Sequence, residues 1–163
     1  MAYSPIDPVI GLQLFTETST TKNHTLGFRV KGRDEDRGVG EFIYLLGVAS
    51  TAIGTWATIN PDDWSTTRLV ANAIGDVGVA MSANVANQYG WYQIYGKASG
   101  LALTAFLDDG RVYATATAGS IDDTVVDGDL VHKALGASAV NETTLLADFE
   151  IEYPYNDDIA GND

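Results

Sequence analysis

Two histidines and a group of four aspartates are the side chains whose types could support acid–base or metal chemistry. His24 and His132 are the only histidines among the 163 residues, and no nucleophile elbow of a serine hydrolase accompanies them. The aspartates lie at positions 122, 123, 127 and 129, and closely spaced carboxylates can bind Ca²⁺. Their spacing departs from the EF-hand loop. A solvated acidic loop is therefore the favoured interpretation, and a calcium site is the alternative.

Other common reaction types lack their residues or have no specific signal. The chain contains no cysteine, which excludes disulfides, thiolate metal sites and cysteine nucleophiles. Gly38, Gly40 and Gly47 are not followed by the lysine and hydroxyl residue of a phosphate-binding loop. Glycoside hydrolysis depends on the distance between two carboxylates, which a sequence does not give. The sequence predicts a protein that is not an enzyme and that has no catalytic residue, cofactor or metal.

The charge of the chain is distributed unevenly. Residues 1–37 carry five basic and five acidic side chains, whereas residues 38–163 carry four basic and seventeen acidic ones, so the whole net charge of −13 falls in the second segment. Such an acidic body repels phosphate backbones and anionic lipid headgroups, which argues against nucleic acid and membrane partners. Solubility alone also explains this charge. The alternative is that the neutral segment binds a partner while the acidic body faces solvent.

The length and the N-terminus indicate one domain without a targeting segment. A chain of 17.3 kDa fits a single domain that buries about 70% of its unfolded surface. No run of 18 apolar residues is present, and the first residues lack the basic and apolar regions of a secretory signal. We therefore expect a soluble protein made in the cytoplasm of its host.

Strand-like segments and turns must position any site, because the sequence offers little helix. Short apolar or alternating runs are separated by glycine, proline and aspartate turn signals, about 8–12 residues apart in the second half. One or two helical turns are expected at 82–88, and a hairpin through Ser50–Gly54. Strands are expected at 41–49, 54–60, 66–71, 77–81, 91–98, 101–106, 111–116, 126–131 and 145–153.

The predicted fold is mainly β, with a single compact β-barrel or β-tulip-like domain over residues 31–155. Residues 1–30 are expected to form an extended N-terminal arm, because Pro5 and Pro8 forbid an early helix and the threonine-rich stretch that follows has no helical periodicity. Such an arm stays extended or disordered until it meets a surface. Residues 156–163 are expected to form a solvated acidic tail.

Two strands carry the clearest face patterns. On the strand around Trp91, Gln93 and Tyr95 share the Trp91 face while Tyr92 and Ile94 share the other, so both faces are apolar and burial on both sides is expected. This aromatic set could be core, a subunit or lattice interface, or a stacking platform for a ligand. From 147 to 153 apolar and acidic residues alternate strictly, which predicts a strand with one buried and one acidic face.

Four segments together resemble a known class of viral protein. In order they are GEFIYLLGVAS at 40–50, Trp56, VAMSANVA at 79–86 and YGWYQIYGKA at 89–98. This pattern resembles the capsid decoration, or cement, proteins of tailed bacteriophages over about residues 25–140. The resemblance implies a compact β-barrel or β-tulip body, commonly a homotrimer, that sits on the outer capsid surface and bridges neighbouring major capsid subunits.

The resulting prediction is a structural virion protein that stabilises the expanded head of a phage. Its partner would be the major capsid protein, with many weak contacts on a repeating lattice giving firm attachment. Two alternatives remain: a minor tail or head-fibre component, and a carbohydrate-binding β module that uses Trp64, Trp91 or Tyr95. The residues expected at the capsid or subunit interface are Phe15, Leu26, Phe28, Arg29, Arg33, Arg37, Trp91 and Tyr95.

Overall fold

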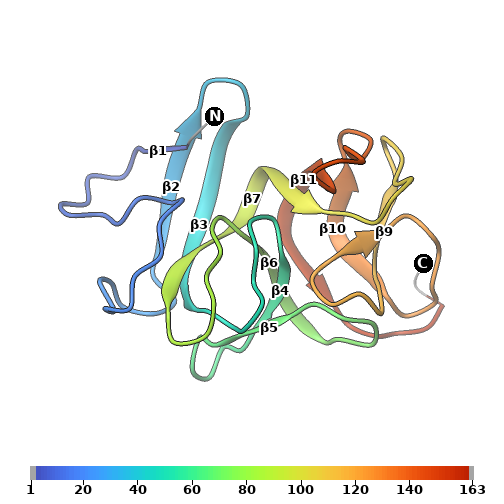
Figure 1. Cartoon of the computed structure of the whole chain (residues 1–163), viewed down its shortest axis with the longest axis horizontal. Helices are drawn as coiled ribbons and strands as arrows, with labels where there is room; N and C mark the ends of the chain where they lie inside the picture. The colour runs from blue at the N-terminus through green and yellow to red at the C-terminus, as the bar shows by residue number, and fades with distance from the viewer. Residues whose placement is uncertain (1–2, 162–163) are drawn as a thin grey trace.

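Eleven strands form one antiparallel sheet in the computed structural model, which describes residues 3–161 (Figure 1). These residues contain no helix, so the expectation of a mainly β protein is confirmed. The strands are β1 (Ser4–Pro5), β2 (Arg29–Asp34), β3 (Gly38–Leu46), β4 (Trp56–Ile59), β5 (Thr66–Arg68), β6 (Gly75–Ala80), β7 (Tyr89–Leu101), β8 (Arg111–Ala114), β9 (Ile121–Asp122), β10 (Leu130–Gly136) and β11 (Leu146–Asn156).

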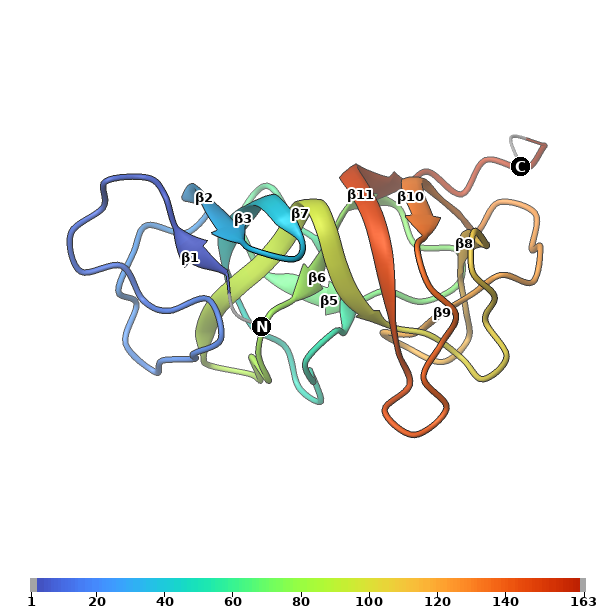
Figure 2. The ribbon, with the colours of Figure 1, turned by 90° about the horizontal axis from the view of Figure 1, so that it is seen from above.

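The sheet is an open path rather than a closed barrel. Its order is β1-β2-β3-β7-β6-β11-β10-β8-β9, with β4 paired to β5 and β6 as a branch. No strand pairing among residues 3–161 joins β1 to β9. Strand β7 also pairs directly with β11, so it belongs to both halves of the sheet. Figure 2 shows the two halves side by side, with β1, β2 and β3 on one side and β8, β9 and β10 on the other.

Strand β7 connects the halves because its first part pairs with β3 along one edge and its second part pairs with β11 along the other. Residues 89–95 pair with β3, and residues 95–101 pair with β11. The change falls at Gly96, whose φ of +95° is a conformation that residues with a side chain rarely adopt. A Cβ atom on Gly96 would lie 2.5 Å from the carbonyl oxygen of Val39. Glycine therefore permits the close approach of β3 and β7 at the point where the pairing with β3 ends and the pairing with β11 begins.

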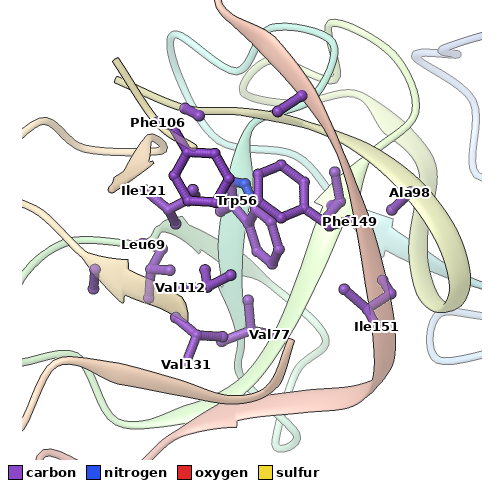
Figure 3. Packing of buried hydrophobic residues seen from close by; sticks show 14 of the residues in the cluster. Trp56, Leu69, Val77, Ala98, Phe106, Val112, Ile121, Val131, Phe149 and Ile151 are labelled. Atoms are coloured by element: carbon purple, nitrogen blue, oxygen red, sulfur yellow. The ribbon is translucent and has the colours of Figure 1, made fainter. Parts of the chain in front are cut away.

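The largest apolar cluster lies in the second half of the molecule. The indole of Trp56 meets the ring of Phe149 edge-on at 5.0 Å between ring centroids, and Phe106 packs against Phe149 at 5.3 Å (Figure 3). Leu69, Val112 and other aliphatic side chains complete this core. These residues come from β4, β8, β11 and the loops between strands, so the cluster fixes elements that are distant in sequence.

The first half of β7 is buried on both faces, as the sequence predicted. Trp91 joins one apolar cluster with Phe42 and Tyr44 of β3. Tyr92 and Ile94 join a second cluster on the opposite face, together with residues of β4. Trp91 and Tyr92 are fully buried. The aromatic set around Trp91 is therefore core, and its use as an exposed interface or ligand platform is wrong for Trp91 itself.

Several local expectations differ from the structure. β3 and β4 do not pair with each other, so the hairpin through Ser50–Gly54 is wrong. The expected strand at 101–106 is also wrong beyond Leu101, where β7 ends and turns begin, and 82–88 forms turns without a helix. The alternation from 147 holds until Ile151, but Tyr153 is 43% exposed. Its φ of +54° interrupts the alternation and turns the side chain outward.

The N-terminal segment is not a free arm. The structure places Tyr3 and Phe15 in the apolar cluster around Trp91, and the expected boundary at residue 30 lies inside β2. β1 pairs with the outer edge of β2, and the backbone N–H of Lys31 donates to the carboxylate of Asp7 at 2.6 Å. The expectation of an extended N-terminal arm that does not pack on its own domain is therefore corrected. Residues 3–28 cover one face and one edge of the β2-β3-β7 sheet.

Candidate binding surfaces

The residues predicted for an interface do not form one surface. Phe15 and Trp91 are in the core, with 2% and 0% of their surface exposed, so they are corrected to structural residues. Leu26 and Phe28 are half-buried and pack against the same cluster. Arg29 and Arg33 are exposed on β2, Arg37 is half-buried in the turn after it, and Tyr95 of β7 is 38% exposed.

Gln13 is a polar centre that fastens the N-terminal segment to the sheet. Its amide nitrogen Nε2 donates to the carbonyl oxygens of Glu17 and Tyr89, at 2.8 and 3.1 Å. Its Oε1 accepts from Asn23 Nδ2 and from the hydroxyl of Tyr44, both at 2.9 Å. Gln13 is only 7% exposed, and buried polar groups cost stability unless they are paired. No sequence motif marks this glutamine, because its partners are scattered along the chain.

The backbone of Gln13 makes two further contacts with aromatic residues. Its carbonyl oxygen accepts from Trp91 Nε1 at 3.0 Å, and its N–H donates to His24 Nε2 at 3.0 Å. The ring of His24 lies 5.0 Å from that of Tyr44 and 5.5 Å from that of Trp91. Burial lowers the pKa of His24 below its usual value. His24 thus has a structural role, because its Nε2 lone pair is occupied by the N–H of Gln13.

Acid is expected to loosen the N-terminal segment through His24. Protonated Nε2 would carry a hydrogen and could not accept from Gln13, so the unfolded chain takes up this proton more readily than the folded one. The free energy of unfolding should therefore fall as pH drops below about 6.5, the ordinary pKa of histidine. Urea midpoints measured between about pH 7.5 and 5 test this. His24→Gln keeps an acceptor without titrating and should flatten the pH dependence; an unchanged slope would contradict the assignment.

A projecting loop carries the exposed apolar side chains of the N-terminal segment. Ile6, Ile10 and Leu14 are each at least half exposed, and Ile10 is fully exposed. The loop follows β1 and extends away from the sheet in Figures 1 and 2. Its base is anchored by Asp7, which accepts from β2, and by Gln13. A fixed scaffold thus presents these three apolar side chains to the surroundings.

A second candidate surface is a groove between the end of the β2–β3 hairpin and strands β10 and β11. Its volume is about 670 Å³, and its lining includes Arg37, Lys97 and Lys133 with Glu150 and Glu152. In Figure 1 the strands β3, β7, β11 and β10 follow one another across this region. The groove lies within the size range of small-molecule sites.

A smaller hollow adjoins this groove. Its volume is about 420 Å³, it is lined by Lys31, Glu41 and Tyr153, and it shares Val39 and Tyr95 with the groove. We call the two hollows together the trough. Tyr95 and Arg37 could be named from the sequence but the other lining residues could not, since Val39 and Tyr153 lie more than 110 residues apart in the chain and no pattern links them.

An ion-pair cluster borders the trough. Asp148 lies 2.7 Å from Arg37 Nη2 and 3.7 Å from Lys97 Nζ. These are partly exposed pairs, each worth at most about 1 kcal/mol, so their main effect is to orient the two cations. Arg37 thereby links the β2–β3 turn to β11. Its role at an interface stays a prediction.

The carboxylates of the acidic loop each accept a hydrogen bond from a different backbone N–H group. Asp129 is buried and accepts from the N–H of Asn72 at 2.5 Å, while Asp123 accepts from the N–H of Leu107. Asp127 accepts from the N–H of Gly161. Within residues 3–161 no group of three or more histidine, aspartate or glutamate side chains could hold a metal ion. The calcium alternative therefore has no ligand cluster in the described part of the chain, and these aspartates stabilise turns.

The aromatic residues considered for carbohydrate binding have different surroundings. Trp91 is buried, and Trp64 is half-buried against the cluster that contains Tyr92, with Gly27 directly over its ring. Tyr95 alone of the three proposed residues lies on an exposed face, and the structure adds Tyr153 beside it.

Comparisons with family models, with curated proteins and with solved structures found no significant match. Among residues 3–161 there is no helix that is long and apolar enough to cross a membrane.

Proposed function

We propose that this chain is a structural, nonenzymatic virion protein that binds the outer capsid surface of a tailed bacteriophage and stabilises the expanded head by bridging neighbouring major capsid subunits. One observation carries the proposal: Ile6, Ile10 and Leu14 are exposed on a loop that a buried polar network holds in place. Apolar side chains presented in this way gain free energy when a partner covers them. The acidic body repels the packaged nucleic acid and so favours the outside of a shell.

The finer features of the decoration family belong to the same proposal. A barrel-like second half is supported by the β8–β9 turn, where Gly119 accepts from the N–H of Trp56 and donates to the carbonyl oxygen of Leu69. These bonds join the turn to the β4–β5 branch.

Homotrimer assembly would multiply weak capsid contacts. Sedimentation of the purified chain at micromolar concentration should give a trimer; a monomer would remove this part of the proposal.

Capsid binding should depend on the projecting loop. The triple change Ile6→Ser, Ile10→Ser and Leu14→Ser removes exposed apolar surface, and binding to purified expanded capsids should weaken at least about tenfold. The side chains make little contribution to the core, so the urea midpoint should stay close to that of the original protein. Binding is measured by co-sedimentation with capsids. Unaltered binding would contradict the role of the loop.

A matched control tests whether any exposed apolar residue has the same effect. Ile74 and Leu107 are 71% and 64% exposed and lie in the other half of the molecule. Ile74→Ser with Leu107→Ser should leave capsid binding unchanged. Copy number in the virion separates the rival function: about one copy per major capsid subunit fits decoration, whereas a handful of copies indicates a minor tail or head-fibre component.

A further inference from the structure

We propose that the trough binds a neutral oligosaccharide, independently of any capsid contact. The trough is the pair of adjoining hollows, about 670 and 420 Å³, that share Val39 and Tyr95. Tyr95 therefore lies between the two hollows and is accessible from both. An elongated ligand could lie across it and extend into each hollow.

A pair of tyrosine rings gives the trough an aromatic platform. The ring centroids of Tyr95 and Tyr153 are 5.5 Å apart, and the side chains are 38% and 43% exposed. The Tyr153 hydroxyl donates to Glu41 Oε2 at 2.9 Å, which fixes the orientation of its ring. Exposed aromatic rings with a fixed orientation offer apolar area at low entropic cost and suit the C–H faces of sugar rings.

The backbone holds part of this platform in a strained conformation. Tyr153 has a φ of +54° and Lys133, which also lines the trough, has a φ of +60°. Bulky residues in the left-handed region are uncommon and persist where the surrounding structure enforces them. At Tyr153 the consequence is specific: regular alternation would turn this ring into the core, and the positive φ places it beside Tyr95 instead.

The polar lining favours a neutral ligand that both donates and accepts hydrogen bonds. Arg37, Lys97 and Lys133 supply donors, and Glu150 and Glu152 supply acceptors. Asp148 offsets two of these cations, so the region has no excess of positive charge that would select a polyanion. The acidic body further disfavours anionic polymers. Sugar hydroxyls match both kinds of group, since each can donate and accept.

The part of β11 that lines the trough, residues 150–152, which we call its floor, does not suit a peptide that binds as an added strand. At Glu150 and Ile151, β11 is paired with β7 on one side and with β10 on the other. The floor therefore offers no free backbone edge, which strand addition requires. A ligand there must be recognised through side chains, as an oligosaccharide is.

The test uses the full, isolated chain and records amide NMR spectra during titration with defined hexasaccharides. The neutral probes are maltohexaose, cellohexaose, xylohexaose and chitohexaose, and hexagalacturonate is the anionic probe. At least one neutral probe should shift amides at 37–41, 95–97, 133–135 and 150–153, with a Kd of about 1 mM or tighter. Silence with every neutral probe, shifts confined to other regions, or a response to hexagalacturonate alone would overturn the proposal.

Variants then assign the binding to the platform. Tyr95→Ala and Tyr153→Ala should each weaken binding roughly 3–10-fold, whereas Tyr153→Phe keeps the ring and should retain most of the affinity. Glu150→Ala changes an exposed floor residue and should weaken binding without affecting the fold. Ile10→Ala on the projecting loop is the matched control and should bind normally. Equal affinity in all variants would overturn the proposal, while capsid binding would remain to be judged by the loop variants.

Discussion

Deleting residues 1–25 is expected to destabilise the whole β2-β3-β7 region rather than to release an intact body. Phe15 stacks on Phe42 at 4.1 Å between ring centroids and meets Trp91 edge-on at 5.5 Å. Tyr3 packs against Phe42 at 5.0 Å. Removing these rings would expose Phe42 and Trp91, both of which are fully buried in the protein.

The expected loss in the free energy of unfolding follows from the cost of removing a buried ring from the cluster around Trp91. Phe15→Ala alone should lower the free energy of unfolding by about 3–5 kcal/mol. The deletion also removes Gln13 and leaves its remaining partners, Tyr44, Tyr89 and Trp91, without their hydrogen bonds to it. Its cost should therefore approach the total stability of a typical domain, about 5–15 kcal/mol. Urea unfolding followed by tryptophan fluorescence measures both, because the indole of Trp91 reports directly on this cluster.

A control within the same segment separates core from surface. Ile10→Ala truncates a fully exposed side chain and should change stability by no more than about 0.5 kcal/mol. If the deletion variant unfolded at the same urea concentration as the full chain, residues 1–25 would be an independent arm and the packing of Phe15 against Phe42 and Trp91 would be wrong. Because the truncation is expected to unfold this region, substitutions in the loop test capsid binding better than a deletion does.

The alternation of side chains along single strands predicted which faces of β7 and β11 are buried. Burial of β7 on both faces followed from Trp91 and Tyr92 pointing in opposite directions, and the buried face of β11 followed from alternation up to Ile151. The packing of residues 3–28 did not follow, because their apolar side chains have no helical or strand period. Only the tertiary structure shows that Phe15 fits between Phe42 and Trp91.

The trough was beyond sequence reasoning for a related reason. Tyr153 belongs to the buried face by alternation, and only its positive φ places it outside. Other residues that line the trough with Tyr95 and Val39 come from β10 and β11. These strands lie beside Tyr95 because β11 pairs with β7 around Gly96. Tyr95 itself was named from the sequence as one of the aromatic set around Trp91, for which an interface or a ligand platform was an alternative to core.

Replacing Gly96 with alanine is expected to disrupt both the junction of the sheet and the trough. A side chain at a φ of +95° is strained, at a cost of about 1–2 kcal/mol. The new Cβ would also lie 2.5 Å from the carbonyl oxygen of Val39 and 3.1 Å from the Cα of Gly40. These are backbone atoms, so relief requires β3 to move away from β7. We expect a total loss of about 3–5 kcal/mol in the free energy of unfolding.

Gly38→Ala provides the matched control for this substitution. Gly38 also has a positive φ, +76°, but a Cβ there would meet nothing within 4 Å. Its cost should therefore be limited to the backbone term of about 1–2 kcal/mol, and the difference between the variants measures the close approach of β3 and β7. Thermal or urea unfolding of both proteins gives this difference. Equal losses would mean that β3 yields without penalty, and the trough would then have a movable wall at Val39 instead of a fixed one.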